Sequence, residues 1–323
     1  MMSRFKLKIS LSFLIMGLLI ALDKLEIAGN TYLSREIQNA GHFPFFGILS
    51  LLILGLLSQF LGKVILNRLW FYFQAFALTL LIGALHEYSQ IIGPRDADIR
   101  DLVRDAGGAV TFLALYMIYD KKMMTNWRKW NRKIKPIIII GAVSLIVSMI
   151  IPSALWGGAY LYRNQNFPTI CGFESMWETK FLKTQDARLE TILPPNKWKD
   201  VTDKNVGKLT FFVAEYPGFA IEEPYPDWSR HKLLNFTVFS ELDSSVQISM
   251  GIEDLRHNND FNDRFNRTFT VDPGLNKISI PLSEIRKAPA SRDMDMSDVR
   301  SIYLFAYKPN EEFMLYFDDF RLE

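Results

Sequence analysis

The stretch from Leu85 to Gly108, LHEYSQIIGPRDADIRDLVRDAGG, decides how the front of this chain folds. Its ionisable and amide side chains lie between two apolar runs, residues 69–85 and 106–119, each of which is typical of a membrane helix. Ionisable groups at the edge of a membrane are energetically costly, and they mark candidate functional sites. We therefore expect a polar site where these two helices end.

The front half contains five apolar segments, which predict a transmembrane bundle of about five helices. The first follows a basic N-terminus, as in a secretory signal, but no small-x-small cleavage motif follows Leu22, so we favour an uncleaved helix. Pro44 fits the first turn of the second helix, and the fourth helix is expected to begin with a polar turn near Asp98. The segments are residues 9–22, 43–61, 69–85, 106–119 and 137–162.

Loop charges orient these helices. The loop 121–135 carries seven Lys and Arg residues and no acidic residue, and the N-terminus and the loop 62–68 are also basic. With five spans, all three lie on one side of the membrane, which the positive-inside rule makes cytoplasmic. This predicts a multi-pass protein of the cytoplasmic (inner) membrane with everything after Tyr162 outside. Orientation explains the basic charge better than nucleic-acid binding, which we exclude.

Charge divides the chain in two. Residues 1–167 carry 18 Lys and Arg against 9 Asp and Glu, whereas residues 168–323 carry 19 against 26. The single Cys171 excludes an intramolecular disulfide and a multi-cysteine metal site. We predict a membrane domain of four spans with a basic loop, a fifth helix with a linker, and an extracytoplasmic domain. Their expected ranges are 1–135, 136–167 and 168–323.

The polar stretch offers a candidate pocket. Helical spacing places Glu87 and Gln90 on one face of the third helix, and Asp101 and Asp105 on one stripe of the fourth. Arg95, in the turn between the helices, is expected to reach toward Glu87. Three hypotheses stay open. In the first, these groups pair with one another and only stabilise the turn. In the second, they bind a lipid headgroup, with a phosphate on Arg95, and in the third, Glu87 acts as a general base.

The order of these residues resembles the signature of the VanZ-like family of bacterial membrane proteins, over about residues 9–120. The matching elements are Glu-x-x-Gln, Pro-Arg, Asp-Leu and Gly-Gly. That family is associated with lowered sensitivity to teicoplanin-type glycopeptides, so the resemblance implies contact with an envelope lipid or glycan. Asp105 departs from the family pattern, which usually has Asn there. Gly107 and Gly108 most simply allow close approach of helices.

The back half shows a different periodicity. From Thr169 on, short runs alternate between apolar and polar residues and are separated by turn signals such as Asp272-Pro273-Gly274. This pattern predicts an all-β jelly-roll sandwich. The expected strands lie near residues 208–213, 232–239, 245–252, 267–271, 276–280, 299–305 and 313–317.

Residues 168–323 also resemble the galactose-binding-like, jelly-roll carbohydrate-binding modules of bacterial glycoside hydrolases. Matching pieces, in order, are FE at 173–174, YPG at 216–218, DWS at 227–229, NDRF at 262–265, PGLN at 273–276, IPL at 280–282 and YFDDFRL at 316–322. The resemblance implies that aromatic side chains stack on sugar rings, with Trp177, Tyr225 and Trp228 as candidates; the alternative for Trp228 is a place in the core.

In such modules a structural calcium joins an early Glu to a late Asp, which implies Glu174 and Asp318 here. The alternative is that both are surface acids at strand ends. The sequence identifies no paired catalytic carboxylates in this half, so we do not interpret it as a hydrolase.

Three functions are compatible with these features. The first, which we favour, is a non-enzymatic envelope protein whose jelly roll binds glycan while the VanZ-like part contacts a glycolipid or lipid-carrier headgroup. The second is a membrane enzyme that acts on an envelope lipid or glycan through Glu87 and Arg95. The third is a membrane-anchored protein-interaction module. The expected partners are membrane lipids and carbohydrate.

Overall fold

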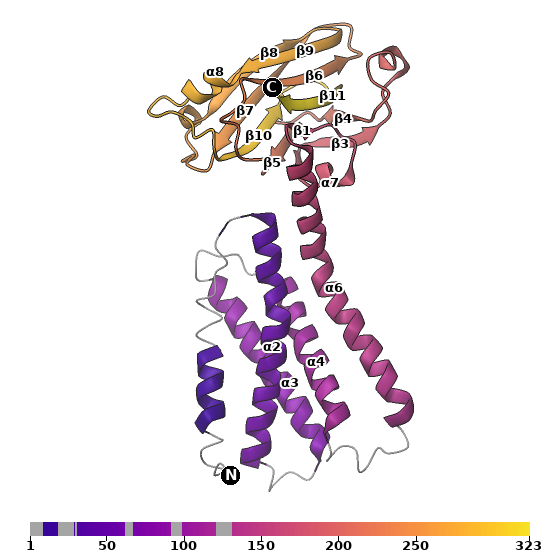
Figure 1. Cartoon of the computed structure of the whole chain (residues 1–323), viewed down its shortest axis with the longest axis vertical. Coiled ribbons are helices and arrows are strands. Elements are labelled where there is room, and N and C mark those ends of the chain that lie inside the picture. Colours follow the sequence, from indigo (N-terminus) through magenta and orange to yellow (C-terminus); the bar gives the residue numbers. More distant parts are fainter. Residues whose placement is uncertain (1–8, 19–28, 30, 62–66, 92–98, 121–130) are drawn as a thin grey trace. The chain divides into compact units, whose positions relative to one another are not determined.

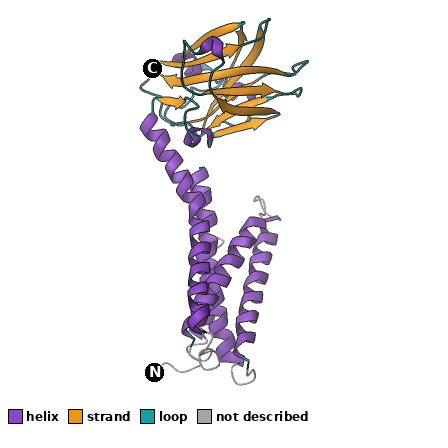
Figure 2. Ribbon diagram, turned by 90° about the vertical axis from the view of Figure 1, so that its right-hand side faces the viewer, coloured by secondary structure: helices purple, strands orange, loops and turns teal. Residues whose placement is uncertain are grey.

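The chain divides into two compact units, residues 1–157 and 158–323. The computed structural model describes residues 9–18, 29, 31–61, 67–91, 99–120 and 131–323. The first unit is helical, and the second is an antiparallel β sandwich (Figures 1 and 2). The predicted combination of a helical bundle and a β sandwich is therefore confirmed. The boundary between the two units, at 157/158, lies ten residues before the predicted boundary at 167/168.

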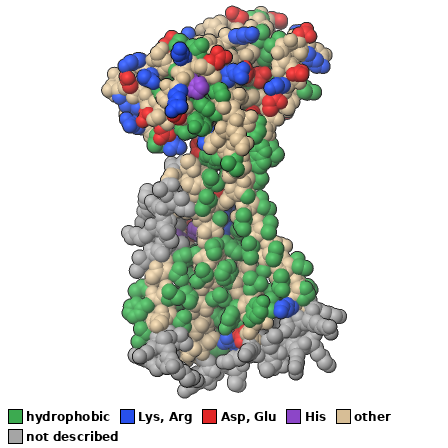
Figure 3. Space-filling view, in the orientation of Figure 1, with side chains coloured by type: hydrophobic (Ala, Val, Ile, Leu, Met, Phe, Trp, Pro, Cys, Tyr) green, Lys and Arg blue, Asp and Glu red, His purple; other side chains and the backbone are tan. Residues whose placement is uncertain are grey.

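The helical unit contains long apolar helices. Among the described residues, four helices are long and apolar enough to cross a membrane, and a shorter apolar helix covers Ile9–Leu18. On the face shown in Figure 3, hydrophobic side chains dominate the surface of these helices. The long helices are α2 (Tyr32–Leu61), α3 (Arg68–Ile91), α4 (Ile99–Tyr119) and α6 (Asn131–Asn166), the last of which runs on into the second unit. Helix α4, which corresponds to the predicted segment 106–119, begins at Ile99, next to the expected polar start at Asp98.

Helix α2 begins eleven residues before the expected segment 43–61, so the placement of Pro44 in a first turn is wrong. The start is fixed by reciprocal hydrogen bonds. The Ser34 amide donates to Thr31 Oγ1 over 3.1 Å, and the Thr31 amide donates to Ser34 Oγ over 3.0 Å. This pairing resembles a capping box, which satisfies amides at a helix start. Polar residues therefore extend the helix before its apolar run.

Glycines allow α2 and α4 to pack closely. A Cβ atom on Gly108 would lie 2.0 Å from the carbonyl oxygen of Phe43, and one on Gly47 would lie 2.4 Å from the Phe112 ring. A side chain at position 108 would clash with the backbone of α2, and one at position 47 would require the Phe112 ring to move. The expectation that Gly108 serves close helix approach is confirmed.

The sandwich consists of two antiparallel sheets. Within residues 158–323, all of which are described, one sheet has the order β3-β4-β11-β6-β9 with β1 paired to β11, and the other has the order β2-β5-β10-β7-β8. The strands are β1 (Thr169–Cys171), β2 (Leu182–Gln185), β3 (Ala187–Ile192), β4 (Val206–Phe211), β5 (Gly218–Glu222), β6 (Leu233–Ser240), β7 (Val246–Asp254), β8 (Phe265–Val271), β9 (Gly274–Pro281), β10 (Val299–Phe305) and β11 (Phe313–Leu322). Short helices α7 (Met176–Thr179) and α8 (Leu282–Lys287) join them.

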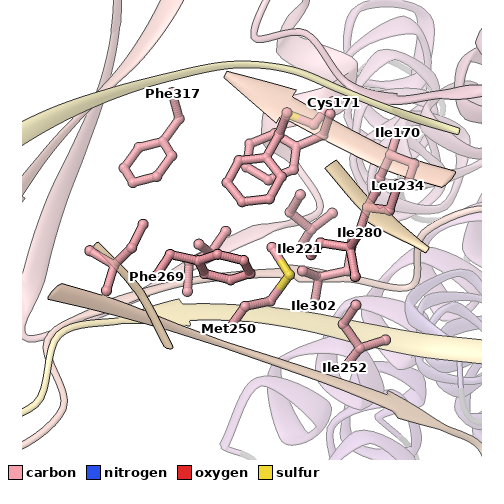
Figure 4. Close-up of a cluster of buried hydrophobic side chains, with 14 of the residues drawn as sticks. Ile170, Cys171, Ile221, Leu234, Met250, Ile252, Phe269, Ile280, Ile302 and Phe317 are labelled. Atoms are coloured by element: carbon pink, nitrogen blue, oxygen red, sulfur yellow. The ribbon is translucent and has the colours of Figure 1, made fainter. Parts of the chain in front are cut away.

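Apolar side chains from both sheets meet in one core (Figure 4). Phe236 and Phe320 stack with centroids 4.9 Å apart at its centre. Phe173 is fully buried beside Gly207, where a Cβ would lie 2.4 Å from its ring. Cys171 also lies in this core, and burial raises the pKa of its thiol well above the usual value. A buried thiol with a raised pKa is a poor nucleophile.

Candidate functional site

Three helices of the first unit bring polar groups together. His42 comes from α2, Glu87 from the last turn of α3, and Asp101 and Asp105 from the first turns of α4. His42 Nδ1 lies 3.0 Å from Asp105 Oδ1. One ligand atom each from His42, Glu87 and Asp101 lies within 4.8 Å of the others. We refer to these four residues as the polar cluster.

Two members of the polar cluster are buried among the helices, and the other two, His42 and Asp101, are partly buried. Asp105 is 0% exposed and Glu87 is 8% exposed. Asp105 Oδ2 has no hydrogen-bond partner among the described residues. Asp101 forms an ion pair with Arg104 one turn further along α4, and the His86 ring lies 6.4 Å from that of His42. A buried carboxylate oxygen without a partner is energetically costly.

The structure brings together three of the five predicted pocket residues, Glu87, Asp101 and Asp105. Arg95 lies outside the described residues, as does the side chain of Gln90, although its backbone belongs to α3. His42 was not among the predicted pocket residues. In the sequence it is a lone histidine directly before an apolar run. Only its contact with Asp105, 63 residues away, identifies it as part of a polar site.

The second candidate site is a groove of about 1070 Å³ on the outer face of the sheet β2-β5-β10-β7-β8. Strand alternation creates it. In β10, Ile302 and Leu304 point into the core, so Tyr303 and Phe305 face the groove. On the flanking strands the partners of Tyr303 are Ala220 and Gly251. Both neighbours are small, and the Tyr303 side chain is partly exposed.

Aromatic side chains mark two regions of the groove. Tyr216 lies 5.4 Å from Tyr307 and 5.7 Å from Phe305, measured between ring centroids. Elsewhere in the groove, Arg264 lies over the rings of Phe261 and Tyr303. Tyr216, Tyr307 and Phe261 are 44%, 59% and 62% exposed.

Polar side chains also line the groove. Ser249 and Thr268 share a hydrogen bond of 2.9 Å, and the Tyr303 hydroxyl donates to Glu253 Oε1 over 2.5 Å. Burial and this hydrogen bond raise the pKa of Tyr303 to about 12. Burial and the nearby charges of Glu223 and Glu253 raise the pKa of Glu222. The floor thus combines hydroxyl and carboxylate groups. Its further polar lining residues include Lys183, Gln185, Gln247, His257 and Asn266.

The three predicted sugar-stacking residues do not line this groove. Trp228 is 0% exposed, and its indole N–H donates to the Tyr225 carbonyl over 2.7 Å. The prediction that Trp228 contacts sugar is therefore wrong, and the alternative prediction that it lies in the core is confirmed. Tyr225 stacks on Phe167 at 4.1 Å, and the Trp177 ring packs over Gly158. Both keep partly exposed surface.

The predicted calcium ligands are electrostatically coupled. Burial raises the pKa of Asp318 to about 6, and the charges of Asp319 and Glu174 add to the shift. Glu174 is exposed and Asp318 is half-buried. Two neighbouring carboxylates of this kind fit a cation in part, because calcium takes six to eight oxygen ligands. The other ligands would be backbone carbonyls or water.

No protein-family model and no curated protein matches the sequence. Among solved structures, the chain is similar to an exo-β-agarase, with 16% identity and a TM-score of 0.39, over 48% of this chain and 25% of that one. It is also similar to a family 11 carbohydrate-binding module from Clostridium thermocellum, solved with a β-1,3-1,4-mixed-linked tetrasaccharide. There the identity is 19% and the TM-score 0.37, over 48% of this chain and 93% of the module. A family 30 module of Clostridium thermocellum gives 16% identity and a TM-score of 0.33, over 44% of this chain and 86% of the module. This chain thus spans only a quarter of the length of the agarase.

Proposed function

We propose that this protein is an integral membrane protein of the bacterial cell envelope whose β sandwich binds a glycan in the groove over β10. The observation that carries the proposal is the lining of that groove, which combines exposed aromatic rings with polar side chains. The resemblance of residues 168–323 to carbohydrate-binding modules agrees with it.

The chemistry of the groove suits sugar rings. The apolar face of a pyranose packs on an aromatic ring, as Tyr216, Tyr307 and Phe261 offer here, with little loss of side-chain entropy. Sugar hydroxyls both donate and accept hydrogen bonds, so a floor of hydroxyls, amides and carboxylates can satisfy them. Polar groups placed among aromatic ones give orientation and specificity to a binding site.

A glycan array tests this function. The full chain, held in lipid nanodiscs, should bind a limited set of oligosaccharides, and binding should be competed by the same free sugars. Empty nanodiscs are the background control. Absence of binding to any glycan, with a sandwich shown to be folded by circular dichroism, would reject the proposal and favour the protein-interaction alternative.

The membrane location and orientation belong to the same proposal. Four apolar helices support a membrane protein, and the positive-inside rule applied to the basic loops favours a cytoplasmic position for residues 121–135 and an outside position for the sandwich. Cysteines introduced at positions 23, 95 and 244 should react with an impermeant maleimide in intact cells, and one at position 129 should not. A protected position 244 would overturn this orientation.

A second candidate function is that the helical unit contacts an anionic lipid or lipid-carrier headgroup, as the resemblance to VanZ-like proteins implies. The buried polar cluster favours it, because ionisable groups among membrane helices serve functions more often than structure. Arg95→Lys should weaken headgroup binding, since lysine lacks the bidentate guanidinium geometry. Glu87→Gln separates binding from catalysis: an enzyme loses turnover while lipid binding is kept. Unchanged binding and turnover in both variants would leave only a structural role for the stretch.

A further inference from the structure

We propose that His42, Glu87 and Asp101 bind a divalent transition-metal ion of the zinc class, and that Asp105 is the positioning residue that holds the histidine ring. This inference goes beyond glycan binding and does not depend on it, since the metal site lies in the helical unit and the groove in the sandwich.

The first support is convergence. The three residues belong to three different helices, yet their ligand atoms lie within 4.8 Å of one another. Ligands bound about 2.1 Å from a tetrahedral zinc ion lie roughly 3.4 Å apart. Small side-chain rotations would therefore close these atoms around an ion. The ion pair to Arg104 engages Asp101 through Oδ1, and a carboxylate has a second oxygen for ligation.

The second support is the contact between His42 and Asp105. A histidine that ligates a metal almost always donates its other ring N–H to a carboxylate or carbonyl, which fixes the tautomer and the ring orientation. Asp105 Oδ1 occupies that position, 3.0 Å from Nδ1. The tautomer protonated on Nδ1 leaves the Nε2 lone pair for the metal.

The third support is the buried oxygen of Asp105. This side chain is 0% exposed, and its Oδ2 has no hydrogen-bond partner among the described residues. It points at Gly83, where a Cβ would lie only 2.7 Å away. Gly83 precedes Glu87 by one helical turn on α3, so the glycine makes room for the carboxylate on the face that carries Glu87. A buried carboxylate with an unsatisfied oxygen is stabilised when a cation binds close to it.

The donor set selects the class of ion. Imidazole suits zinc, iron, copper and nickel, whereas magnesium and calcium prefer sites made of oxygen alone. One imidazole and two carboxylates therefore favour Zn²⁺, with Co²⁺ as its spectroscopic substitute. Three protein ligands leave one position open, as in zinc sites that bind water or a ligand oxygen.

The test uses the full chain in detergent or nanodiscs, stripped with a chelator and then reloaded with Zn²⁺ or Co²⁺. The wild type should bind one ion per chain by elemental analysis. With Co²⁺ it should develop visible absorption bands typical of a four- or five-coordinate site. His42→Gln, Glu87→Gln and Asp101→Asn should each lose the stoichiometric ion and the bands. Asp105→Asn should keep the site but weaken its affinity by about 10–100-fold.

Glu36→Gln is the matched control, because it removes a carboxylate from the same helix as His42 but outside the polar cluster; it should bind like the wild type. Size-exclusion chromatography shows whether each variant is folded. The wild-type measurement is decisive even if one variant fails to fold. Substoichiometric metal in the wild type, or full binding retained in Glu87→Gln, would overturn the proposal.

Discussion

His42 Nδ1 on α2 lies 3.0 Å from Asp105 Oδ1 on α4, inside the helical unit. The two helices can approach this closely because Gly108 presents no side chain to the backbone of Phe43. Phe43 follows His42 directly, so the glycine contact and the polar contact belong to one crossing point. The packing of the helices and the placement of the polar cluster therefore depend on each other.

Gly108→Ala should disrupt this crossing. The new Cβ would lie 2.0 Å from the Phe43 carbonyl oxygen, which is backbone and cannot rotate away. We expect a loss of about 2 kcal/mol or more in stability, in the range of overpacked cores. Thermal unfolding in detergent measures it. Gly141→Ala is the control, because nothing lies within 4 Å of its added Cβ, and equal stability of the two variants would refute the close-approach argument.

Arg292 should be the most sensitive ionic residue of the sandwich. Its guanidinium donates to both oxygens of Asp254 over 2.5 and 2.7 Å, and to Asp263 Oδ1 over 2.6 Å. Burial alone would raise the pKa of Asp254, but the hydrogen bonds from Arg292 lower it overall. Arg292→Ala leaves the buried Asp254 charge unpaired and should cost about 3 kcal/mol.

Chemical denaturation of the Arg292 variants measures this cost. Arg292→Lys should recover only part of the loss, because it cannot donate in bidentate fashion. The exposed Lys287–Asp293 pair supplies the control, since Lys287→Ala should change the free energy of unfolding by less than about 0.5 kcal/mol. The wild-type advantage over Arg292→Ala should shrink as pH falls through the lowered pKa of Asp254. Equal effects of Arg292→Ala and Lys287→Ala would contradict the account.

The end of helix α6 should stabilise the isolated sandwich. Arg163 donates to the carbonyl oxygens of Glu223 and Pro224 over 2.8 and 3.3 Å, and the Tyr160 hydroxyl hydrogen-bonds to the Glu223 carboxylate. A fragment 158–323 should therefore melt several degrees above a fragment 168–323, as differential scanning calorimetry would show. Arg163→Ala in the longer fragment should remove part of that gain. Identical melting of both fragments would mean that these contacts contribute nothing.

Calcium should stabilise the sandwich in a pH-dependent way. The folded-state pKa of Asp318, about 6, lies above its ordinary 3.8, so the fold favours the protonated carboxyl. Without calcium, the protonated Asp318 carboxyl contributes its full stabilisation of the fold below about pH 4, and this stabilisation is lost as pH rises through 6. Calcium binds the ionised carboxylate, so the increase in stability on adding calcium should be larger at neutral pH than at pH 5. At a hundredfold excess over Kd the gain is about 2.7 kcal/mol.

Asp318→Asn should abolish both the calcium gain and this part of the pH dependence. Asp243→Asn, which changes an exposed acid elsewhere in the sandwich, should abolish neither. Equal melting of the wild type in calcium and in chelator would remove Glu174 and Asp318 as a calcium site.

The sequence predicts much of the fold because its periodicity is local. The strands from 206 on that alternate cleanly, such as 246–254 and 299–305, were all predicted within a few residues. The missed strands β1, β2, β3 and β5 are short or lie in polar surroundings, where alternation is weak. The early start of α2 was missed because its capping residues, Thr31 and Ser34, precede a polar first half.

The sites were harder to predict because they depend on contacts between distant segments. Glu87, Asp101 and Asp105 carry a helical spacing that can be read locally, whereas His42 joins them only through the packing of α2 on α4. The groove is similar. Tyr303 faces outward only because its strand lies in the middle of a sheet whose register fixes which face is buried. The tryptophan of the DWS turn was an attractive sugar contact, but a large apolar ring contributes more when buried in the core.

The most direct test of the central claim is the glycan affinity of a groove variant. We expect Tyr216→Ala/Tyr307→Ala to weaken binding of any glycan found on the array at least tenfold, about 1.4 kcal/mol, because both exposed rings of one aromatic region are lost. The control is Met176→Ala/Leu193→Ala, which removes two side chains of similar exposure, 66% each, outside the groove. Isothermal titration calorimetry should show wild-type affinity for the control and the tenfold loss for the groove variant. Equal affinity of the two variants, with both folded, would contradict a glycan site in the groove.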